Sequence, residues 1–345
     1  MTPSEFLDLI QKLVLAHAPS GHEAEVDAVL QAEFGARCEA VSQDAAGNLI
    51  AYLPGRQPGR AVGITAHKDE IGMIVKRVDP SGRLSVRQIG GAQPWVYGEG
   101  VVDVLGDREV VSGILSFGTR HVSDESPHHA FRSVPVTWEG AWIETKLSPA
   151  ELQEKGIHVG TKAVIGRHRK QPFRLGPYLA GYALDCKVAA AILVYLLDQF
   201  QEEPPARDTY LVATSQEEVG IQGAAFFART HALETLIAIE VGPVADEYQT
   251  VNDGRPILLY QDATFLYSEG LTRDLAAAGQ RLGIDTQYAC VTNFGSDASV
   301  SYHYGYVPQA ACIGYPTENT HGFEIAHLEG IENTAKLLAE YLRQG

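Results

Sequence analysis

Acidic and histidine side chains recur in this sequence where short apolar segments end. They are found at His67-Lys68-Asp69-Glu70, Asp185, Glu217-Glu218, Glu240, and Asp297 with His321. Open α/β sheets form their ligand clefts at such strand ends, so these side chains could converge. Converging carboxylates repel one another unless a cation lies among them. Two histidines and three acids, with further free carboxylates, fit a hydrolase centre that holds two zinc or two cobalt ions.

His67 follows the apolar segment 61–66, and Asp69 lies two residues further on. Residues i and i+2 of an extended chain face the same side, so Asp69 could accept the second ring N–H of His67. Metal-bound histidines commonly have a second partner of this kind. A His–Asp pair with a purely structural role explains the spacing equally well.

Glu217 and Glu218 follow the apolar segment 209–214. Two adjacent acids usually lie in a solvated turn, but the apolar neighbours Val219 and Ile221 favour a buried position here. Adjacent side chains point in different directions. One of the two acids can therefore bind a metal while the other stays free as a base.

The remaining candidates are individually explained by structure alone. Asp185 precedes a very apolar helical segment and could be its N-cap. Glu240 could form a salt bridge, and His321 lies in a polar loop. The metal hypothesis therefore depends on the complete set of residues and on no single one.

Apolar periodicity indicates which elements position these residues. It predicts helices over 4–16, 23–34, 185–200, 223–231, 267–282 and 329–342, and strands over 48–52, 61–66, 209–214, 236–241 and 310–313. The alternation of strands and helices predicts an α/β fold, a three-layer α/β/α sandwich around a mostly parallel or mixed sheet.

Between 73 and 165 the pattern changes to short strands separated by Gly, Pro and charged turns, with one helix over 149–155. This change predicts a β-rich domain inserted into the sandwich. The catalytic domain would then comprise 1–72 and 166–345. His121, His128 and His129 fall inside the insert, in a segment typical of a surface loop.

Composition excludes several classes of protein. The 345 residues include 27 Lys and Arg against 43 Asp and Glu, a net charge of −16. This balance argues against nucleic acid or an anionic membrane as a partner. The longest fully apolar run, 188–197, is shorter than the roughly 20 residues of a membrane span. The N-terminal segment lacks signal-peptide features, and four cysteines without a C-x-x-C pair are typical of reduced thiols, so we expect a cytoplasmic protein.

No Gly-x-Ser-x-Gly, Walker A or G-x-G-x-x-G motif supports a serine hydrolase, an NTPase or a dinucleotide enzyme. The segments that the sequence does contain occur in a fixed order: Ala66-His67-Lys68-Asp69-Glu70-Ile71-Gly72, Ala183-Leu184-Asp185, Gln216-Glu217-Glu218-Val219-Gly220 with Gly223-Ala224, Gly295-Ser296-Asp297-Ala298, and Pro316-Thr317 with His321. Their order and spacing resemble the M42 family of metallo-aminopeptidases, which includes glutamyl aminopeptidases and tetrahedral TET-type peptidases. The resemblance extends over nearly the whole chain.

The resemblance implies a role for each candidate. His67 and Glu240 would hold one metal ion, and Glu218 and His321 the other. Asp185 would bridge the two ions, which would be Zn²⁺ or Co²⁺, with Mn²⁺ as a further option. By the same resemblance, Glu217 would be the general base and Asp69 would orient His67. The insert would be a PDZ-like or β-barrel dimerisation domain, in a homo-oligomer that ranges from a dimer to a dodecamer.

Four departures from the family pattern are visible. Glu240 replaces the common Asp, and Cys186 stands where Asp or Asn usually follows the bridging residue. The loop 317–320 lacks the usual basic and aromatic residues, and 252–256 lacks a Lys that is common near the substrate pocket. The metal ligands are therefore retained while the loops around the substrate differ.

The predicted reaction is the release of N-terminal residues from peptides, with Glu318 as a candidate acid for the free α-amine of the substrate. Two alternatives stay open. One is an amidase or deacylase of the same fold that acts on small N-blocked amino acids or dipeptides. The other is a catalytically inactive metal-binding assembly protein, although retention of Glu217 beside Glu218 speaks against it.

Overall fold

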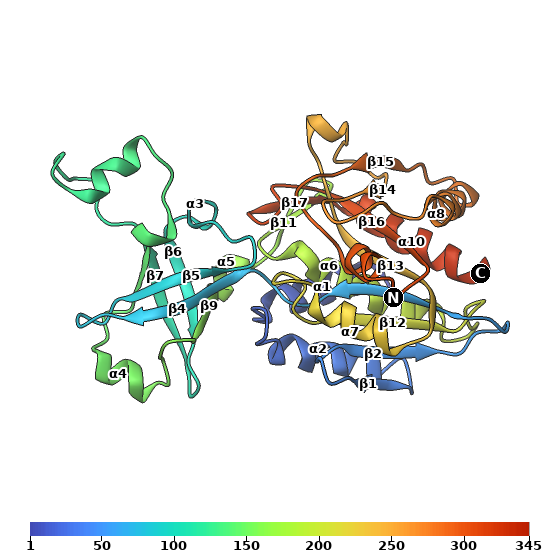
Figure 1. Ribbon diagram of the computed structural model, residues 1–345, viewed down its shortest axis with the longest axis horizontal. Helices are drawn as coiled ribbons and strands as arrows, with labels where there is room; N and C mark the ends of the chain where they lie inside the picture. The colour runs from blue at the N-terminus through green and yellow to red at the C-terminus, as the bar shows by residue number, and fades with distance from the viewer. Residues whose placement is uncertain (345) are drawn as a thin grey trace.

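The computed structural model describes residues 1–344. The chain forms a three-layer α/β/α sandwich and a β-barrel that projects from it (Figure 1). Local signals start the first helix, α1 (Pro3–Leu15): Thr2 caps it, Glu5 completes a capping box and Pro3 occupies the first turn. The three-layer sandwich with its β-rich insert confirms the predicted fold class.

The sheet of the sandwich has eleven strands. Along its main path they are β1 (Val41–Gln43), β2 (Leu49–Leu53), β12 (Thr209–Thr214), β3 (Ala61–His67), β13 (Leu233–Pro243), β16 (Gln309–Glu318), β17 (Glu324–His327), β11 (Tyr178–Gly181) and β10 (Phe173–Leu175). Off this path, β14 (Ile257–Gln261) pairs with β16 and with β15 (Gln287–Cys290).

The centre of the sheet is parallel, and the two ends of its main path are antiparallel. Strands β12, β3, β13 and β16 run parallel, with Thr214 opposite His67 and Glu240 opposite Gly314. The carboxyl ends of these four strands therefore meet at one edge of the sheet. That edge is where a ligand cleft is expected in an open α/β sheet.

Two apolar cores cover the two faces of the sheet. The larger contains residues of α1, α2 (Ala24–Gly35), α6 (Leu184–Gln199), α8 (Glu269–Arg281) and α10 (Leu328–Gln344). The smaller contains residues of α7 (Gln222–Thr230) and α9 (Asp297–His303). Helix α6, almost wholly buried, packs against β3 and β13, which explains its lack of a polar face.

The barrel is closed and antiparallel, and it surrounds its own apolar core. Its strands, in spatial order, are β4 (Gly72–Val78), β5 (Leu84–Ile89), β8 (Trp142–Glu144), β7 (Val110–Ser116), β6 (Gly100–Leu105) and β9 (Lys162–Ile165). Short helices attached to the barrel are α3 (Pro94–Tyr97), α4 (Pro149–Glu154), α5 (Arg167–Lys170), η1 (Pro127–Arg132) and η2 (Trp138–Gly140); η3 (Asp246–Tyr248) belongs to the sandwich.

Buried polar contacts join the barrel to the sandwich. Asp103 of β6 accepts hydrogen bonds from His17 Nε2 of the sandwich at 3.0 Å and from the Arg167 backbone N–H at 2.8 Å, and, within the barrel, from Ser112 Oγ at 3.0 Å. Lys170 of α5 forms an ion pair with Glu70 at 2.9 Å, at a point where both side chains are buried. The barrel is therefore attached by charged groups as well as by its two connecting segments.

The prediction of one helix within 73–165 was wrong, because α3, η1 and η2 also lie there. Pro94 and Pro127 each start one of these helices within a segment that reads as a turn.

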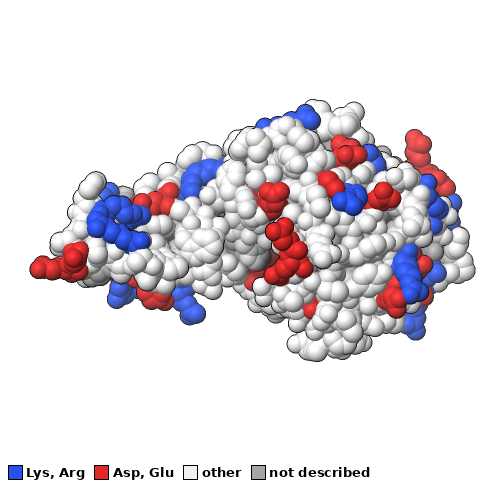
Figure 2. All heavy atoms as spheres, turned by 90° about the horizontal axis from the view of Figure 1, so that it is seen from above, with Lys and Arg blue, Asp and Glu red and all other residues white. Residues whose placement is uncertain are grey.

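No helix within residues 1–344 is long and apolar enough to cross a membrane. On the face shown in Figure 2, Lys and Arg form small separate groups among acidic side chains.

Candidate metal centre

The candidate ligands converge at the carboxyl ends of the parallel strands. His67 is the last residue of β3, Glu240 lies in β13, and Glu218 follows β12. Asp185 lies in the first turn of α6, and His321 follows β16. Residues far apart in the chain thus meet at the edge where the sheet topology places a cleft.

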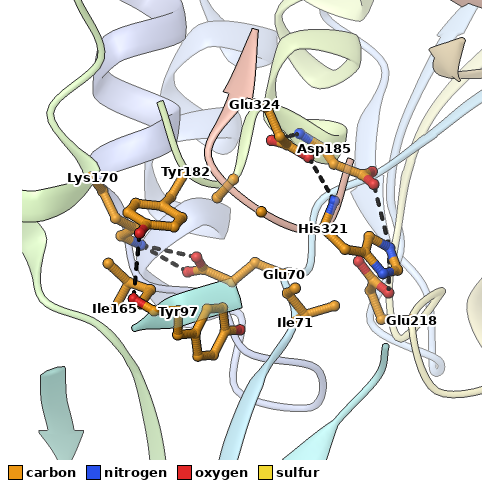
Figure 3. A pocket seen from close by; sticks show the side chains of 12 residues that line it. Glu70, Ile71, Tyr97, Ile165, Lys170, Tyr182, Asp185, Glu218, His321 and Glu324 are labelled. Atoms are coloured by element: carbon orange, nitrogen blue, oxygen red, sulfur yellow. Dashed lines mark hydrogen bonds and ion pairs between the residues drawn. The ribbon is translucent and has the colours of Figure 1, made fainter. Parts of the chain in front are cut away.

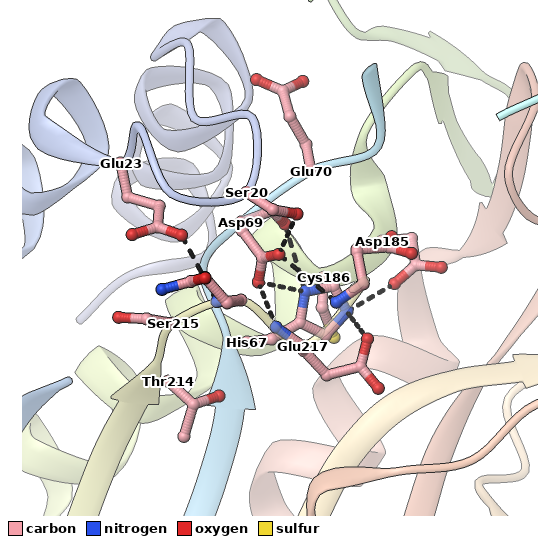
Figure 4. Close-up of polar contacts among 12 residues, drawn as sticks. Ser20, Glu23, His67, Asp69, Glu70, Asp185, Cys186, Thr214, Ser215 and Glu217 are labelled. Carbon is pink, nitrogen blue, oxygen red and sulfur yellow. Dashed lines mark hydrogen bonds and ion pairs between the residues drawn. The ribbon is translucent and has the colours of Figure 1, made fainter. Parts of the chain in front are cut away.

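The first cluster contains His67, Asp185, Cys186 and Glu240, all buried. His67 Nε2 lies 3.0 Å from Asp185 Oδ1 and 3.8 Å from Glu240 Oε2. The other ring nitrogen, Nδ1, donates to the backbone carbonyl of Asp69 at 3.1 Å when it carries the proton. This contact leaves Nε2 as the ring nitrogen that faces the carboxylates (Figure 4).

The second cluster contains Asp185, Glu218 and His321. His321 Nε2 lies 3.5 Å from Asp185 Oδ2 and 3.5 Å from Glu218 Oε2. Asp185 therefore belongs to both clusters, with Oδ1 toward His67 and Oδ2 toward His321. Figure 3 shows Asp185, Glu218 and His321 together at the side of a small cavity.

The carboxylates of the site destabilise one another. Burial raises the pKa of Glu217 well above its usual range, and the charges of Glu218 and Asp297 add to this effect. Burial, together with the charges of neighbouring acids, likewise raises the pKa of Glu218 and of Glu240. For Asp185 burial opposes ionisation, but the hydrogen bond from His67 and the charges of His67 and His321 together outweigh it and lower the pKa.

The residues fit divalent metal ions. Glu240 Oε1 is buried without a hydrogen-bond partner among residues 1–344, which is costly for a carboxylate oxygen unless a cation contacts it. Imidazole and carboxylate are common ligands of zinc and cobalt. Because cations would also relieve the mutual repulsion of the acids, both the geometry and the electrostatics favour metal binding at the two clusters.

The role predicted for Asp69 is made more specific by the structure. Its carboxylate lies 3.5 Å from His67 Nδ1, but the closer acceptor is its own backbone carbonyl. The carboxylate accepts instead from Ser20 Oγ at 2.6 Å and from the backbone N–H groups of Glu217 at 3.0 Å and Glu218 at 3.3 Å. Asp69 therefore holds the chain that carries the two glutamates as well as His67.

The sequence model of the M42 glutamyl aminopeptidase family matches residues 47–337. The chain belongs to this family. It is 26% identical to the YhfE protein of Bacillus subtilis over 98% of this chain and 97% of that protein. The structure of the aminopeptidase APDkam598 from Desulfurococcus kamchatkensis is 26% identical, with a TM-score of 0.89 over 99% of this chain and 96% of that one.

The TET1 peptidase of Pyrococcus horikoshii has the same fold, with a TM-score of 0.87 and 23% identity over 100% of both chains. That protein can assemble into a tetrahedron or a large octahedral shell. Membership of the M42 family makes this chain a hydrolase of the aminopeptidase class. The family is metal-dependent, in agreement with the two clusters.

A cleft of about 590 Å³ opens in front of the M42 centre. Glu217 and all the metal-cluster residues except Cys186 line it. Its outer walls include Tyr248, Phe294 and Asn319. Glu318 does not line this cleft, because its carboxylate turns away and accepts from Asn252 Nδ2 at 3.2 Å. This placement does not favour Glu318 as the acid that binds a substrate amine.

Sequence reasoning missed Glu324. Its buried carboxylate accepts from the backbone N–H groups of Leu184 at 2.7 Å, Asp185 at 3.1 Å and His321 at 3.2 Å. Glu324 thereby ties the bridging ligand to the loop that carries His321. The only signal in the sequence is an acid within the short apolar segment 323–326, three residues after His321.

Asp297 also lies beside the site without lining the cleft. Its Oδ2 accepts from Thr214 Oγ1 at 2.7 Å, and burial raises its pKa to about 6. The three histidines of the insert loop, His121, His128 and His129, are absent from both metal clusters found within residues 1–344. His129 pairs instead with Asp124 at 2.9 Å.

Proposed function

We propose that this chain is an aminopeptidase whose centre holds two divalent metal ions. The observation that carries the proposal is the position of Asp185, whose two carboxylate oxygens face two separate sets of ligands. His67 and Glu240 complete one set, and Glu218 and His321 complete the other. Such a shared carboxylate is the expected bridge of a dinuclear hydrolase.

When bound, the metal ions would polarise the scissile carbonyl and lower the pKa of an attacking water. Glu217 is placed to take the proton of that water and to return it to the leaving amine. Its Oε2 lies 4.0 Å from His67 Nε2, and its side chain lines the cleft. Within residues 1–344 its carboxylate makes no hydrogen bond, so it is available for proton transfer.

Two buried acids hold this machinery in place. Asp69 accepts from the backbone of Glu217 and Glu218, which fixes the base relative to the neighbouring ligand. Glu324 does the same for Asp185 and His321. Fixed positions matter because proton transfer requires the base to lie within hydrogen-bond reach of the proton.

The barrel is proposed to mediate self-association. It projects from the sandwich, and its core is independent of the sandwich cores (Figure 1). We expect a homo-oligomer between a dimer and a dodecamer, in which deletion of 73–165 disturbs assembly.

The four cysteines are free in the structure, which supports a reducing compartment such as the cytoplasm.

Dipeptides with free and N-acetylated amino termini test the proposed reaction. The metal-depleted protein would be loaded with Zn²⁺, Co²⁺ or Mn²⁺ and assayed with both forms of each peptide. We expect cleavage of the free form only after metal addition. Preference for the acetylated form would assign an amidase or deacylase instead, and no cleavage under any condition would contradict catalysis.

A further inference from the structure

The thiol of Cys186 lies among the residues of the first cluster. Its Sγ, a ring nitrogen of His67 and a carboxylate oxygen of each of Asp185 and Glu240 all lie within 4.8 Å of one another. The side chain is completely buried at the start of α6. The sulfur is therefore held where a fourth ligand of this cluster would be.

The contacts of the thiol are weak. Sγ donates to the backbone carbonyl of Ile239 at 3.3 Å or to Glu240 Oε2 at 3.7 Å. A third contact, 4.0 Å from the Tyr315 hydroxyl oxygen, is longer still, and a thiol is a poor hydrogen-bond donor, so none of these contacts holds the sulfur strongly beside three ionisable groups. Cys186 and Cys312, the two fully buried thiols, both belong to apolar cores of the sheet, but of the two only Cys186 is part of a metal cluster within residues 1–344.

Glu240 supplies a second, independent indication of a ligand. The residue is 4% exposed, and its Oε1 has no hydrogen-bond partner among residues 1–344. The same carboxylate contacts both Cys186 and His67 through its other oxygen. The carboxylate that contacts the thiol and the imidazole is thus incompletely paired, as expected where a cation completes its contacts.

The separations suit one tetrahedral ion. Bonds of about 2.0–2.3 Å place the ligand atoms of a tetrahedral zinc roughly 3.3–3.6 Å apart. Sγ lies 3.7 Å from Glu240 Oε2, and Oε2 lies 3.8 Å from His67 Nε2. Shifts of a few tenths of an ångström would bring these atoms to coordination distance.

We propose that Cys186 is a ligand of the metal ion in the first cluster. The proposal rests on the dinuclear centre proposed above and deepens it. On binding, the S–H bond breaks, the proton leaves to solvent and a sulfur–metal bond forms. A thiolate favours zinc over manganese, whereas the second cluster has only nitrogen and oxygen ligands. The two halves of the centre would thus prefer different metals.

Cobalt loading tests this assignment spectroscopically. The metal-depleted full chain would be titrated with Co²⁺ while the near-ultraviolet thiolate-to-cobalt charge-transfer band is recorded. We expect the band in the wild type, its loss in Cys186→Ser and its retention in the control Cys312→Ser. A variant with Cys38, Cys290 and Cys312 all changed to Ser keeps Cys186 as the only thiol and should retain the band, even where Cys186→Ser fails to fold.

Metal preference gives a second readout. Loss of an outer-shell partner costs about 10–100-fold in metal affinity, so loss of a direct ligand should weaken Zn²⁺ binding at one site by about 100-fold or more. Mn²⁺ binding should change far less. Cys186→Asn restores a residue common in the family and should narrow the preference for Zn²⁺ over Mn²⁺.

Failure of this inference differs from failure of the proposed function. Binding of both metal ions and peptide cleavage without any charge-transfer band would overturn the role of Cys186 and leave the aminopeptidase intact. A band that persists in Cys186→Ser would overturn it as well. No metal binding to the wild type would overturn both proposals.

Discussion

The two halves of the proposed metal centre differ in how the protein holds them. The first cluster is built on β3, β13 and the start of α6, and the His67 side chain is 2% exposed. The second depends on His321, whose side chain is 39% exposed and lies in the loop after β16. Both halves line the cleft, but the first is part of the sandwich core, whereas the second depends on a loop.

The barrel lies directly against the second half. Gly91, in the segment between β5 and α3, lies directly against the His321 ring. Glu324 fixes the same loop from the opposite side through the His321 backbone N–H. We infer that the first cluster can form with the sandwich alone, and that the second needs the barrel in its place.

Asp185→Asn should have the largest effect, because the bridge serves both halves. The amide keeps the size of the side chain but lacks the charge that two dications require. We expect loss of affinity at both clusters and a fall in turnover greater than the roughly 100-fold typical of outer-shell changes. Metal analysis and peptide cleavage would measure this, and loss from one cluster only would contradict the bridge.

His321→Ala should separate the halves. The variant should keep the ion of the first cluster, lose that of the second and retain its fold, since His321 is partly exposed. Metal analysis by mass spectrometry should show about one ion per chain. Loss of both ions would show that the two halves are not independent.

Gly91→Ala tests the contribution of the barrel. A Cβ at this position would lie 2.4 Å from His321 Nδ1, so the ring must move. We expect metal affinity to fall about 10-fold at the second cluster alone, similar to the loss of an outer-shell partner. Gly270→Ala is the control, because its Cβ would meet nothing within 4 Å. If the two variants bound metal at the second cluster with equal affinity, the barrel would have no role in that cluster.

The attachment of the barrel should weaken in acid. Burial opposes ionisation of Asp103, but the hydrogen bonds from His17, Arg167 and Ser112 outweigh it and lower the pKa to about 2. A lowered pKa stabilises the folded state above the unfolded value of about 3.9, and this contribution is lost as the pH falls toward 2.

Asp103→Asn should therefore lower the free energy of unfolding by about 1–2 kcal/mol at pH 7, and its difference from the wild type should shrink toward pH 2. Denaturant titrations at several pH values would measure it. A difference that does not vary with pH would show that charge does not hold the barrel. This is the smallest of the expected effects.

The same contrast explains what could be predicted from the sequence. Strands β3, β12 and β13 are continuous apolar runs, so their ends and the acids that follow them were visible. Strands β10, β11 and β17, at one end of the sheet, are short and lack such runs, and they were missed. Glu324 lies on β17, so its role depends on a strand pairing that no local pattern indicates.

Other contacts follow only from the folded chain. Gly91 and His321 are distant in sequence, and nothing near either residue indicates that they touch. Asp69 was expected to orient His67 through its carboxylate, whereas its backbone carbonyl makes the closer contact. Predicted roles of the metal ligands and of Glu217 remain predictions until metal content and turnover are measured together.

Glu217→Gln set beside Glu218→Gln is the most direct test of the dinuclear hydrolase. Glu217→Gln should keep about two ions per chain and lose about 10²–10⁴-fold in turnover, because the amide cannot accept a proton. Glu218→Gln should lose one ion and melt at a lower temperature, since bound metal stabilises the fold. Metal analysis, peptide cleavage and thermal melting of both variants would decide. Loss of an ion in Glu217→Gln with both ions kept in Glu218→Gln would reverse the roles, and full activity in both would contradict the account.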